Sequence, residues 1–229
     1  MARQCSDSRA GRVPVDQPGV EMAQMLNVPA VVHGVTVLHH AETPRIARFL
    51  HADFPIRLEH GFGSPCQGTR SGRDDIGSVL DAVEWLRAVG VANDRIEICV
   101  DLGHVARCYR NGRWNGRPET YIGQALLPDL RTYDEEGLRV SEAHVHNLVP
   151  GRGLQGDHHH LEESGGVIPI ADTVQFLAER YPGISFAIET GAESALVAKL
   201  AGLGWVDQIR REEEDRLLED VELVIEAAS

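Results

Sequence analysis

Five short apolar stretches recur along the chain, and each of them ends in a polar or ionisable residue. The stretches are nearly continuous in Val, Ile, Leu and Ala, which is the pattern of strands buried in a parallel sheet. We predict strands over residues 29–34, 55–61, 96–104, 138–147 and 184–190.

Segments with the period of an α-helix separate these stretches. Residues 43–52 start with Thr43 as a helix N-cap and Pro44 at the first helical position. Strands that alternate with helices predict βα units and an α/β fold with a parallel sheet. Two further segments and the C-terminus carry apolar stripes at helical spacing, formed by Ile76, Val79, Leu80, Val83 and Leu86, by Val174, Leu177, Ala178 and Tyr181, and by Leu217, Leu218, Val221, Val224 and Ile225.

Length then limits the kind of α/β fold. A complete eight-stranded barrel has about 250 residues, whereas this chain has 229 residues, and only its five apolar stretches are convincing strands. We therefore predict one domain, a TIM (β/α) barrel shortened at its N-terminus, with outer helices around parallel strands. Residues 1–28 are expected to be irregular or a partial helix, residues 208–229 to form a final helix, and the connections 61–75 and 105–137 to be irregular.

The charge and the cysteines restrict the class of protein. The net charge of −13 argues against a nucleic-acid partner, because such a surface repels phosphate backbones. No apolar run reaches the roughly 20 residues of a membrane span and no apolar leader opens the chain, so we expect a cytoplasmic protein. The four cysteines show no CxxC pairing and are interpreted as reduced, incidental thiols: Cys5, Cys66, Cys99 and Cys108.

Ionisable side chains gather at the ends of the predicted strands. Residues 141–166 alone contain five of the eleven histidines. The carboxyl ends of parallel strands meet at one rim of a barrel, and imidazole and carboxylate groups together suit Mn²⁺, Zn²⁺, Mg²⁺ or Co²⁺. Each residue alone is more often an ordinary structural side chain, so the prediction depends on the joint pattern. The candidates are His33, Glu59, Asp101, His104, His144, His146, Asp157, His159 and Glu189.

The order of these groups resembles the motifs of the xylose isomerase-like TIM barrel superfamily. This superfamily contains sugar and sugar-phosphate isomerases and epimerases as well as AP endonuclease-like enzymes. The motifs that carry the resemblance are "LEH" at 58–60, "VDLGH" at 100–104, "HVHN" at 144–147, "GDHHHLEESGGVI" at 156–168 and "FAIET" at 186–190. Two departures are Asn147, where many relatives have Asp, and "EESGG" in place of a Gly-x-Gly turn.

The resemblance implies a four-residue site for one divalent metal ion, formed by Glu59, Asp101, His144 and Glu189. His146 competes with His144 for this role, because the two lie two residues apart and face the same way in a strand. The resemblance further implies that His104 contacts the substrate or a second metal, and that Asp157 and His159 add ligands or orient the substrate. His33 is similar to the early strand-end histidine of the endonuclease-like branch.

The activity implied by the resemblance is isomerisation or epimerisation of a sugar-like hydroxy-carbonyl substrate, as part of carbohydrate metabolism. The metal would stabilise an enediolate, while Glu59 and Glu189 remove and return a proton and His104 binds a hydroxyl oxygen. Arg113 or Arg152 would anchor an anionic group of the substrate, with Trp114 as an apolar lid.

Two other functions stay open. One is metal-dependent phosphodiester hydrolysis of the AP endonuclease-like kind, which the acidic charge disfavours. The other is a non-catalytic partial barrel that binds metal or a partner and completes itself as a homo-oligomer, since open sheet edges have to be covered.

Overall fold

A parallel sheet forms the centre of the protein. The structure is a computed structural model that describes residues 30–33, 55–59, 75–109, 114–150, 159–162, 164–189 and 206–229. Its five strands are hydrogen-bonded in chain order and every neighbouring pair is parallel, which confirms the five predicted strands. The strands are β1 (Ala30–His33), β2 (Ile56–Glu59), β3 (Ile96–Asp101), β4 (Arg139–Val145) and β5 (Ser185–Ile188).

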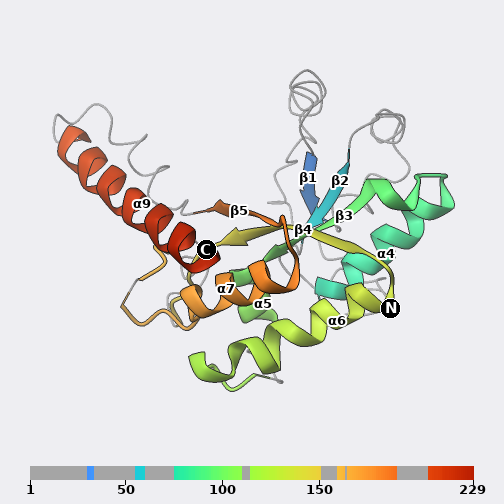
Figure 1. The fold of residues 1–229 in the computed structure, drawn as a ribbon, viewed down its shortest axis with the longest axis horizontal. Coiled ribbons are helices and arrows are strands. Elements are labelled where there is room, and N and C mark those ends of the chain that lie inside the picture. The colour runs from blue at the N-terminus through green and yellow to red at the C-terminus, as the bar shows by residue number, and fades with distance from the viewer. Residues whose placement is uncertain are drawn as a thin grey trace, which may run out of the picture.

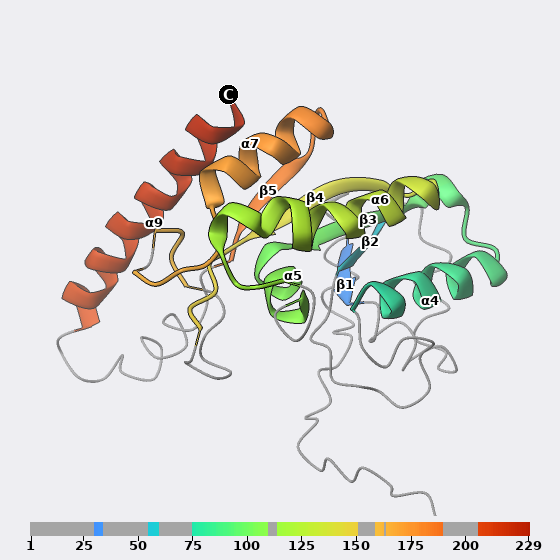
Figure 2. The same ribbon diagram turned by 90° about the horizontal axis from the view of Figure 1, so that it is seen from below.

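Helices follow the strands and pack on the sheet. Figure 1 shows α4, α6 and α7 on the same side of the strands, and in Figures 1 and 2 the helix α9 lies against α7. Short 3₁₀ turns occupy Asn93–Arg95 and Pro118–Thr120, and a π-helical turn occupies Ile122–Leu126. The α-helices are α4 (Asp75–Ala88), α5 (Leu102–Tyr109), α6 (Leu127–Glu135), α7 (Ile170–Arg180) and α9 (Val206–Ala228).

The two faces of the sheet differ in chemistry. In β3, Ile96, Ile98 and Val100 belong to the apolar core that also includes Val79 of α4 and Leu177 of α7. The alternate residues of β3 are Glu97, Cys99 and Asp101, and all six residues of the strand are buried. The sequence predicted strands with apolar side chains at nearly every position. For β3 this expectation is wrong, because one of the two buried faces of the strand is polar.

One extra residue in β4 determines which side chains reach the polar face. Val140 is paired with Ile98, but the next partner of β3, Cys99, is paired with Glu142, so the register shifts at Ser141 as in a β-bulge. As a result, Glu142 lies beside Cys99 and His144 lies beside Asp101.

The predicted strand 96–104 ends earlier than expected. β3 stops at Asp101, and α5 starts at once with Leu102. The Asp101 Oδ1 atom accepts a hydrogen bond of 2.7 Å from the backbone N–H of His104, which is the contact that an N-cap side chain makes with the first turn. His104 therefore lies on a helix and not on a strand.

The prediction that residues 105–137 are irregular is also wrong for most of the described part of that segment. Tyr121, Ala125, Leu130 and Tyr133 are fully buried at helical spacing, and they form the inner face of the π-helical turn and α6. Pro128 interrupts this pattern in the sequence, and in the structure it lies in the first turn of α6, directly after the π-helical turn.

The remaining sequence expectations divide into two groups. The final helix is confirmed as α9, although Leu218 and Ile225 of its apolar stripe are each 61% exposed. Among the described helices none combines the length and the apolarity needed to cross a lipid bilayer. The expectations for residues 1–28, the helix at 43–52 and the connection before Asp75 lie outside the described residues.

Candidate metal centre

Four of the predicted ligands converge at the carboxyl end of the sheet. Glu59 ends β2, Asp101 ends β3, His144 lies one residue before the end of β4, and Glu189 follows β5. One ligand atom from each of these side chains lies within 4.8 Å of the others. The backbone N–H of Glu189 donates a hydrogen bond of 3.1 Å to the Val145 carbonyl, which keeps this residue in register with β4 beyond the end of β5.

The His144 ring lies between the acidic groups. Its Nδ1 atom is 3.2 Å from Glu59 Oε1 and 3.0 Å from Glu189 Oε2. The side chains differ in depth, because Asp101 is fully buried whereas the Glu189 side chain is 44% exposed. A molecule that approaches the cluster from solvent would therefore meet Glu189 before Asp101.

Electrostatics in this cluster favour the charged forms of His144 and Asp101. Burial alone would lower the pKa of His144, but hydrogen bonds to Cys99, Glu142, Glu189 and Glu59 outweigh it and raise the pKa. Burial alone would raise the pKa of Asp101, but the attraction and hydrogen bond of His146, with a smaller contribution from His104, lower it. The cluster is thus a concentration of negative charge around one imidazole.

The donor set fits a divalent cation. Asp101 Oδ1 accepts hydrogen bonds from the His104 backbone and from His146 Nε2, but the buried Oδ2 atom accepts none from the described residues. Three carboxylates and an imidazole at this spacing offer oxygen and nitrogen atoms that Mn²⁺, Zn²⁺, Mg²⁺ or Co²⁺ can bind. A cation at this place would also offset the repulsion among the three carboxylates.

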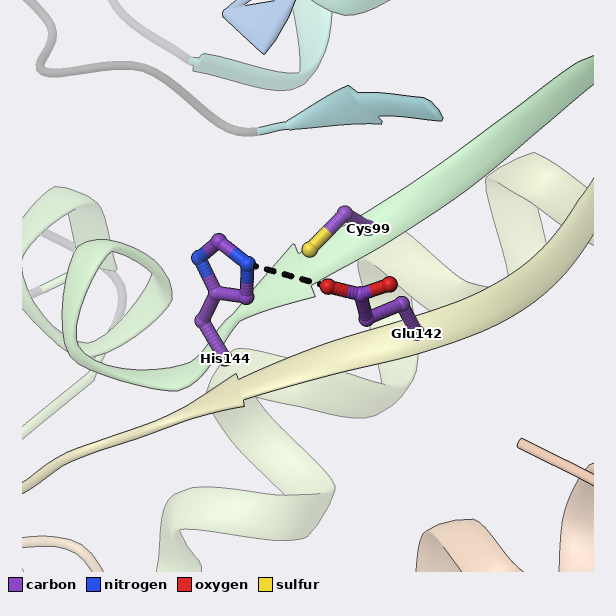
Figure 3. A group of neighbouring side chains, drawn as sticks. All are labelled: Cys99, Glu142 and His144. Carbon is purple, nitrogen blue, oxygen red and sulfur yellow. Dashed lines mark hydrogen bonds and ion pairs between the residues drawn. The ribbon is translucent and has the colours of Figure 1, made fainter. Parts of the chain in front are cut away.

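A second group of potential ligands lies on the other side of the His144 ring. Figure 3 shows Cys99 of β3 and Glu142 of β4 beside this ring, and Glu142 Oε1 is 3.2 Å from His144 Nε2. Burial is the main cause that raises the pKa of the Cys99 thiol to about 12. Neither residue was among the predicted ligands, although each lies two positions before a predicted ligand, the spacing that places side chains on one face of a strand.

His146 and His104 surround Asp101 but lie outside the four-residue group. His146 is fully buried, and its Nε2 atom is 2.9 Å from Asp101 Oδ1. A Cβ atom at Gly103 would lie only 2.0 Å from His146 Cε1, so the lack of a side chain at Gly103 makes room for this ring. His104 Nδ1 lies 3.4 Å from Asp101 Oδ2 and 4.0 Å from Glu59 Oε1.

The histidine-rich segment also has a structural part. The backbones of His159 and Asn147 exchange hydrogen bonds of 3.0 and 3.2 Å. The Asn147 amide donates to the Leu161 carbonyl at 2.7 Å and accepts from the Ile168 N–H at 3.1 Å, so it joins two loops. An aspartate carboxylate has no N–H and could not donate the bond to Leu161, so the asparagine at position 147 has a structural role. Gly166 belongs to the same contact, since a Cβ atom there would lie 2.4 Å from the Asn147 amide nitrogen.

The expected substrate lid is part of the core. Trp114 is 3% exposed, its indole N–H lies within hydrogen-bonding distance of the Arg117 carbonyl and the Thr120 hydroxyl, and its ring packs edge to face on Tyr121. The interpretation of Trp114 as a lid is therefore corrected, because its polar edge and its ring both have partners inside the fold.

Other predicted site residues lie outside what the structure describes. These are Arg113, Arg152, Asp157 and the side chain of His33, whose backbone ends β1 opposite Glu59.

Comparisons with known proteins add little. No protein-family model and no curated protein matches the sequence. Among solved structures, the chain is similar to the crystal structure of a D-tagatose 3-epimerase-like protein, with 16% sequence identity and a TM-score of 0.45 over 92% of this chain and 68% of that chain. A similarity of this size establishes neither a shared activity nor a shared site.

Proposed function

We propose that this chain is a divalent-metal-dependent isomerase or epimerase that moves a proton on a sugar or a related hydroxy-carbonyl compound. The observation that carries the proposal is the convergence of Glu59, Asp101, His144 and Glu189, whose ligand atoms lie within 4.8 Å of one another. Three of these residues lie in β2, β3 and β4 and the fourth directly follows β5, and they are the four that the motif resemblance implies as ligands.

The proposal includes a shortened (β/α) barrel as the fold. The five described strands follow chain order without a reversal, as the strands of a barrel do. In doubly wound sheets the order reverses at a switch point, where the ligand binds. The present site lies instead across the carboxyl ends of β2 to β5, which is where barrel enzymes carry their catalytic groups.

The chemistry is divided between the cation and the acidic side chains. A bound Mn²⁺, Zn²⁺, Mg²⁺ or Co²⁺ ion would supply a Lewis acid that polarises the substrate carbonyl. Glu59 and Glu189 extend from non-adjacent strands toward the same imidazole nitrogen. In the proposed reaction one of these carboxylates removes a proton from the substrate and the other returns it.

His104 completes the proposed arrangement. Its Nδ1 atom lies 4.0 Å from Glu59 Oε1, and the helix α5 holds it beside Asp101. From this position an imidazole N–H can donate a hydrogen bond to a substrate hydroxyl oxygen. Roles for Arg113 and Arg152 in anchoring an anionic group remain part of the proposal.

The test combines metal analysis with solvent exchange. Purified protein is analysed for bound metal and then incubated with a panel of ketoses and ketose phosphates in D₂O, with deuterium incorporation followed by NMR. Bound metal together with exchange at the carbon beside a carbonyl supports the proposal. Bound metal with cleavage of an abasic-site oligonucleotide would replace it with phosphodiester hydrolysis, and bound metal with neither reaction would leave a non-catalytic partial barrel. A protein that binds none of the four metals contradicts the proposal and the phosphodiester hydrolysis, and leaves of the three functions only a partial barrel that binds a partner.

A further inference from the structure

The two nitrogen atoms of His144 face different partners. Nδ1 lies 3.2 Å from Glu59 Oε1 and 3.0 Å from Glu189 Oε2, whereas Nε2 lies 3.2 Å from Glu142 Oε1. A neutral imidazole has one N–H and one lone pair, so the partner of one nitrogen decides what the other nitrogen can bind. Glu142 can accept a hydrogen bond from Nε2, so it favours the tautomer that keeps the proton there.

Glu142 is itself held in place by an arginine. Arg57 Nη1 donates a hydrogen bond to Glu142 Oε2, so the two oxygens of this carboxylate have different partners. Arg57 Nε donates a hydrogen bond of 3.0 Å to Glu97, and the Ser141 hydroxyl donates one of 2.7 Å to the same Glu97 oxygen. The Arg57 side chain is only 17% exposed, so these contacts lie largely out of solvent, where they orient Glu142 effectively.

We propose that Glu142, oriented by Arg57, is a positioning residue that keeps the proton of His144 on Nε2 and leaves Nδ1 for a cation among Glu59, Asp101 and Glu189. The inference rests on the proposed function for the presence of that cation. Carboxylates that accept a hydrogen bond from a metal-binding histidine fix its ring and make the nitrogen that binds the metal more basic.

The structure also offers a competing arrangement. Cys99, Glu142 and His144 form a second group whose ligand atoms lie within 4.8 Å of one another. A cation there would lie close to the Arg57 guanidinium, which is bonded to Glu142 and repels positive charge. The geometry therefore favours the Nδ1 side of the ring over the Nε2 side.

The test compares two isosteric variants of neighbouring carboxylates. Glu142 and Glu97 both bind Arg57, but among these two only Glu142 contacts His144. We expect Glu142→Gln to weaken Co²⁺ and Zn²⁺ binding by about 10-fold or more, as is usual for partners of metal-binding histidines. Glu97→Gln removes the same charge from the same network, and we expect it to change the affinity by less than about threefold. Affinities are measured by competition with a chelator on the full chain, with circular dichroism as the check of folding.

A spectroscopic measurement addresses the tautomer directly. In Zn²⁺-loaded protein with ¹⁵N-labelled histidine, we expect the His144 signals of a protonated Nε2 and a metal-bound Nδ1. The opposite pattern overturns the proposal, and so does a thiolate-to-Co²⁺ absorption band that disappears in Cys99→Ala. Equal affinities of wild type and Glu142→Gln also overturn it, while leaving the proposed function in place. A wild-type protein that binds no divalent metal removes both.

Discussion

Two histidines of this protein contact carboxylates in largely buried surroundings, and the two contacts have different roles. His144 has Glu59 and Glu189 at Nδ1 and Glu142 at Nε2, with Asp101 nearby. His160 has one carboxylate partner of this kind among the described residues, Asp220 of α9, at 2.8 Å from Nδ1.

The Asp220 contact also bonds the main chain. Its other oxygen accepts a hydrogen bond of 3.0 Å from the Leu161 backbone N–H, so one carboxylate holds α9 against residues 159–162. The comparison teaches that several carboxylates in contact with one imidazole, and not a single pairing of histidine with carboxylate, distinguish a candidate cation site from a structural tether. Removal of a carboxylate should therefore affect metal binding in the first region and folding stability in the second.

The largest difference between the regions is expected for Glu189→Gln. The variant removes a charged ligand atom that lies 3.0 Å from His144 Nδ1, so we expect metal affinity to fall by more than about 100-fold, beyond the range for indirect partners, and turnover to be lost. Because this side chain is 44% exposed, the melting temperature of the metal-free protein should stay close to that of wild type. Chelator competition and thermal denaturation measure the two effects. Glu222→Gln on the exposed face of α9 is the matched control, and full activity of Glu189→Gln would refute the role of Glu189.

Gly103→Ala is expected to connect the two kinds of effect. The added Cβ would lie 2.0 Å from His146 Cε1, and His146 binds Asp101, so relief of the clash must move a neighbour of the site. We expect a loss of about 3 kcal/mol in the free energy of unfolding, at the upper end of the usual range for overpacking, together with weaker metal binding. In Gly166→Ala the added Cβ would clash with the Asn147 side chain instead. We therefore expect this variant to lower the stability of the fold without a specific loss of metal affinity. Urea denaturation and chelator competition on both variants measure the two effects. Unchanged metal affinity in folded Gly103→Ala would contradict the expected link between packing at Gly103 and metal binding.

Asp220→Ala should affect the tether alone. The change leaves the buried His160 ring and the Leu161 N–H without this acceptor, so we expect a loss of about 2 kcal/mol in the free energy of unfolding. Metal affinity should remain within about twofold of wild type, since Asp220 is not part of either group of potential ligands. Glu219→Ala, at an exposed neighbouring position, is the control. A large loss of metal affinity in Asp220→Ala would show that the two regions are coupled.

The smallest effect is expected on the outer surface of α9. Leu218 and Ile225 are each 61% exposed, so Leu218→Ser should change the free energy of unfolding by less than about 0.5 kcal/mol. Val224→Ser is the contrasting variant, because Val224 is only 7% exposed and belongs to the apolar core. Denaturation curves of the two variants measure how much of the attachment of α9 depends on its buried side.

The sheet could be predicted from the sequence because its signals are local. Apolar runs of strand length gave all five strands, and a polar residue at the end of each run indicated where side chains would gather. The prediction failed in two places: the segment 105–137, expected to be irregular, contains helical turns, and the motif that ends in His104 contains the helix cap made by Asp101.

The candidate site could be predicted only in part, for a different physical reason. Its four main members come from strand ends and were named from their motifs. The placement of Glu142 beside Cys99 and of His144 beside Asp101 depends on the register shift at Ser141, and the pairing of His160 with Asp220 joins residues 60 positions apart. Neither relationship has a trace in composition or periodicity, because both arise only when distant segments pack together.

The register shift at Ser141 also limits how β4 can vary in length. Val140 and Ala143 are paired with Ile98 and Val100, so two residues spaced by three both belong to the apolar side of the sheet. If Ser141 were deleted, the same residues would remain on each side of the sheet. Regular alternation of the side chains would then place Val140 and Ala143 on the apolar side without a register shift. A chain of the present length that lost the irregularity would instead turn Glu142 and His144 toward the helices. The number of residues between Val140 and Ala143 therefore determines which side chains of β4 reach the polar side of the sheet.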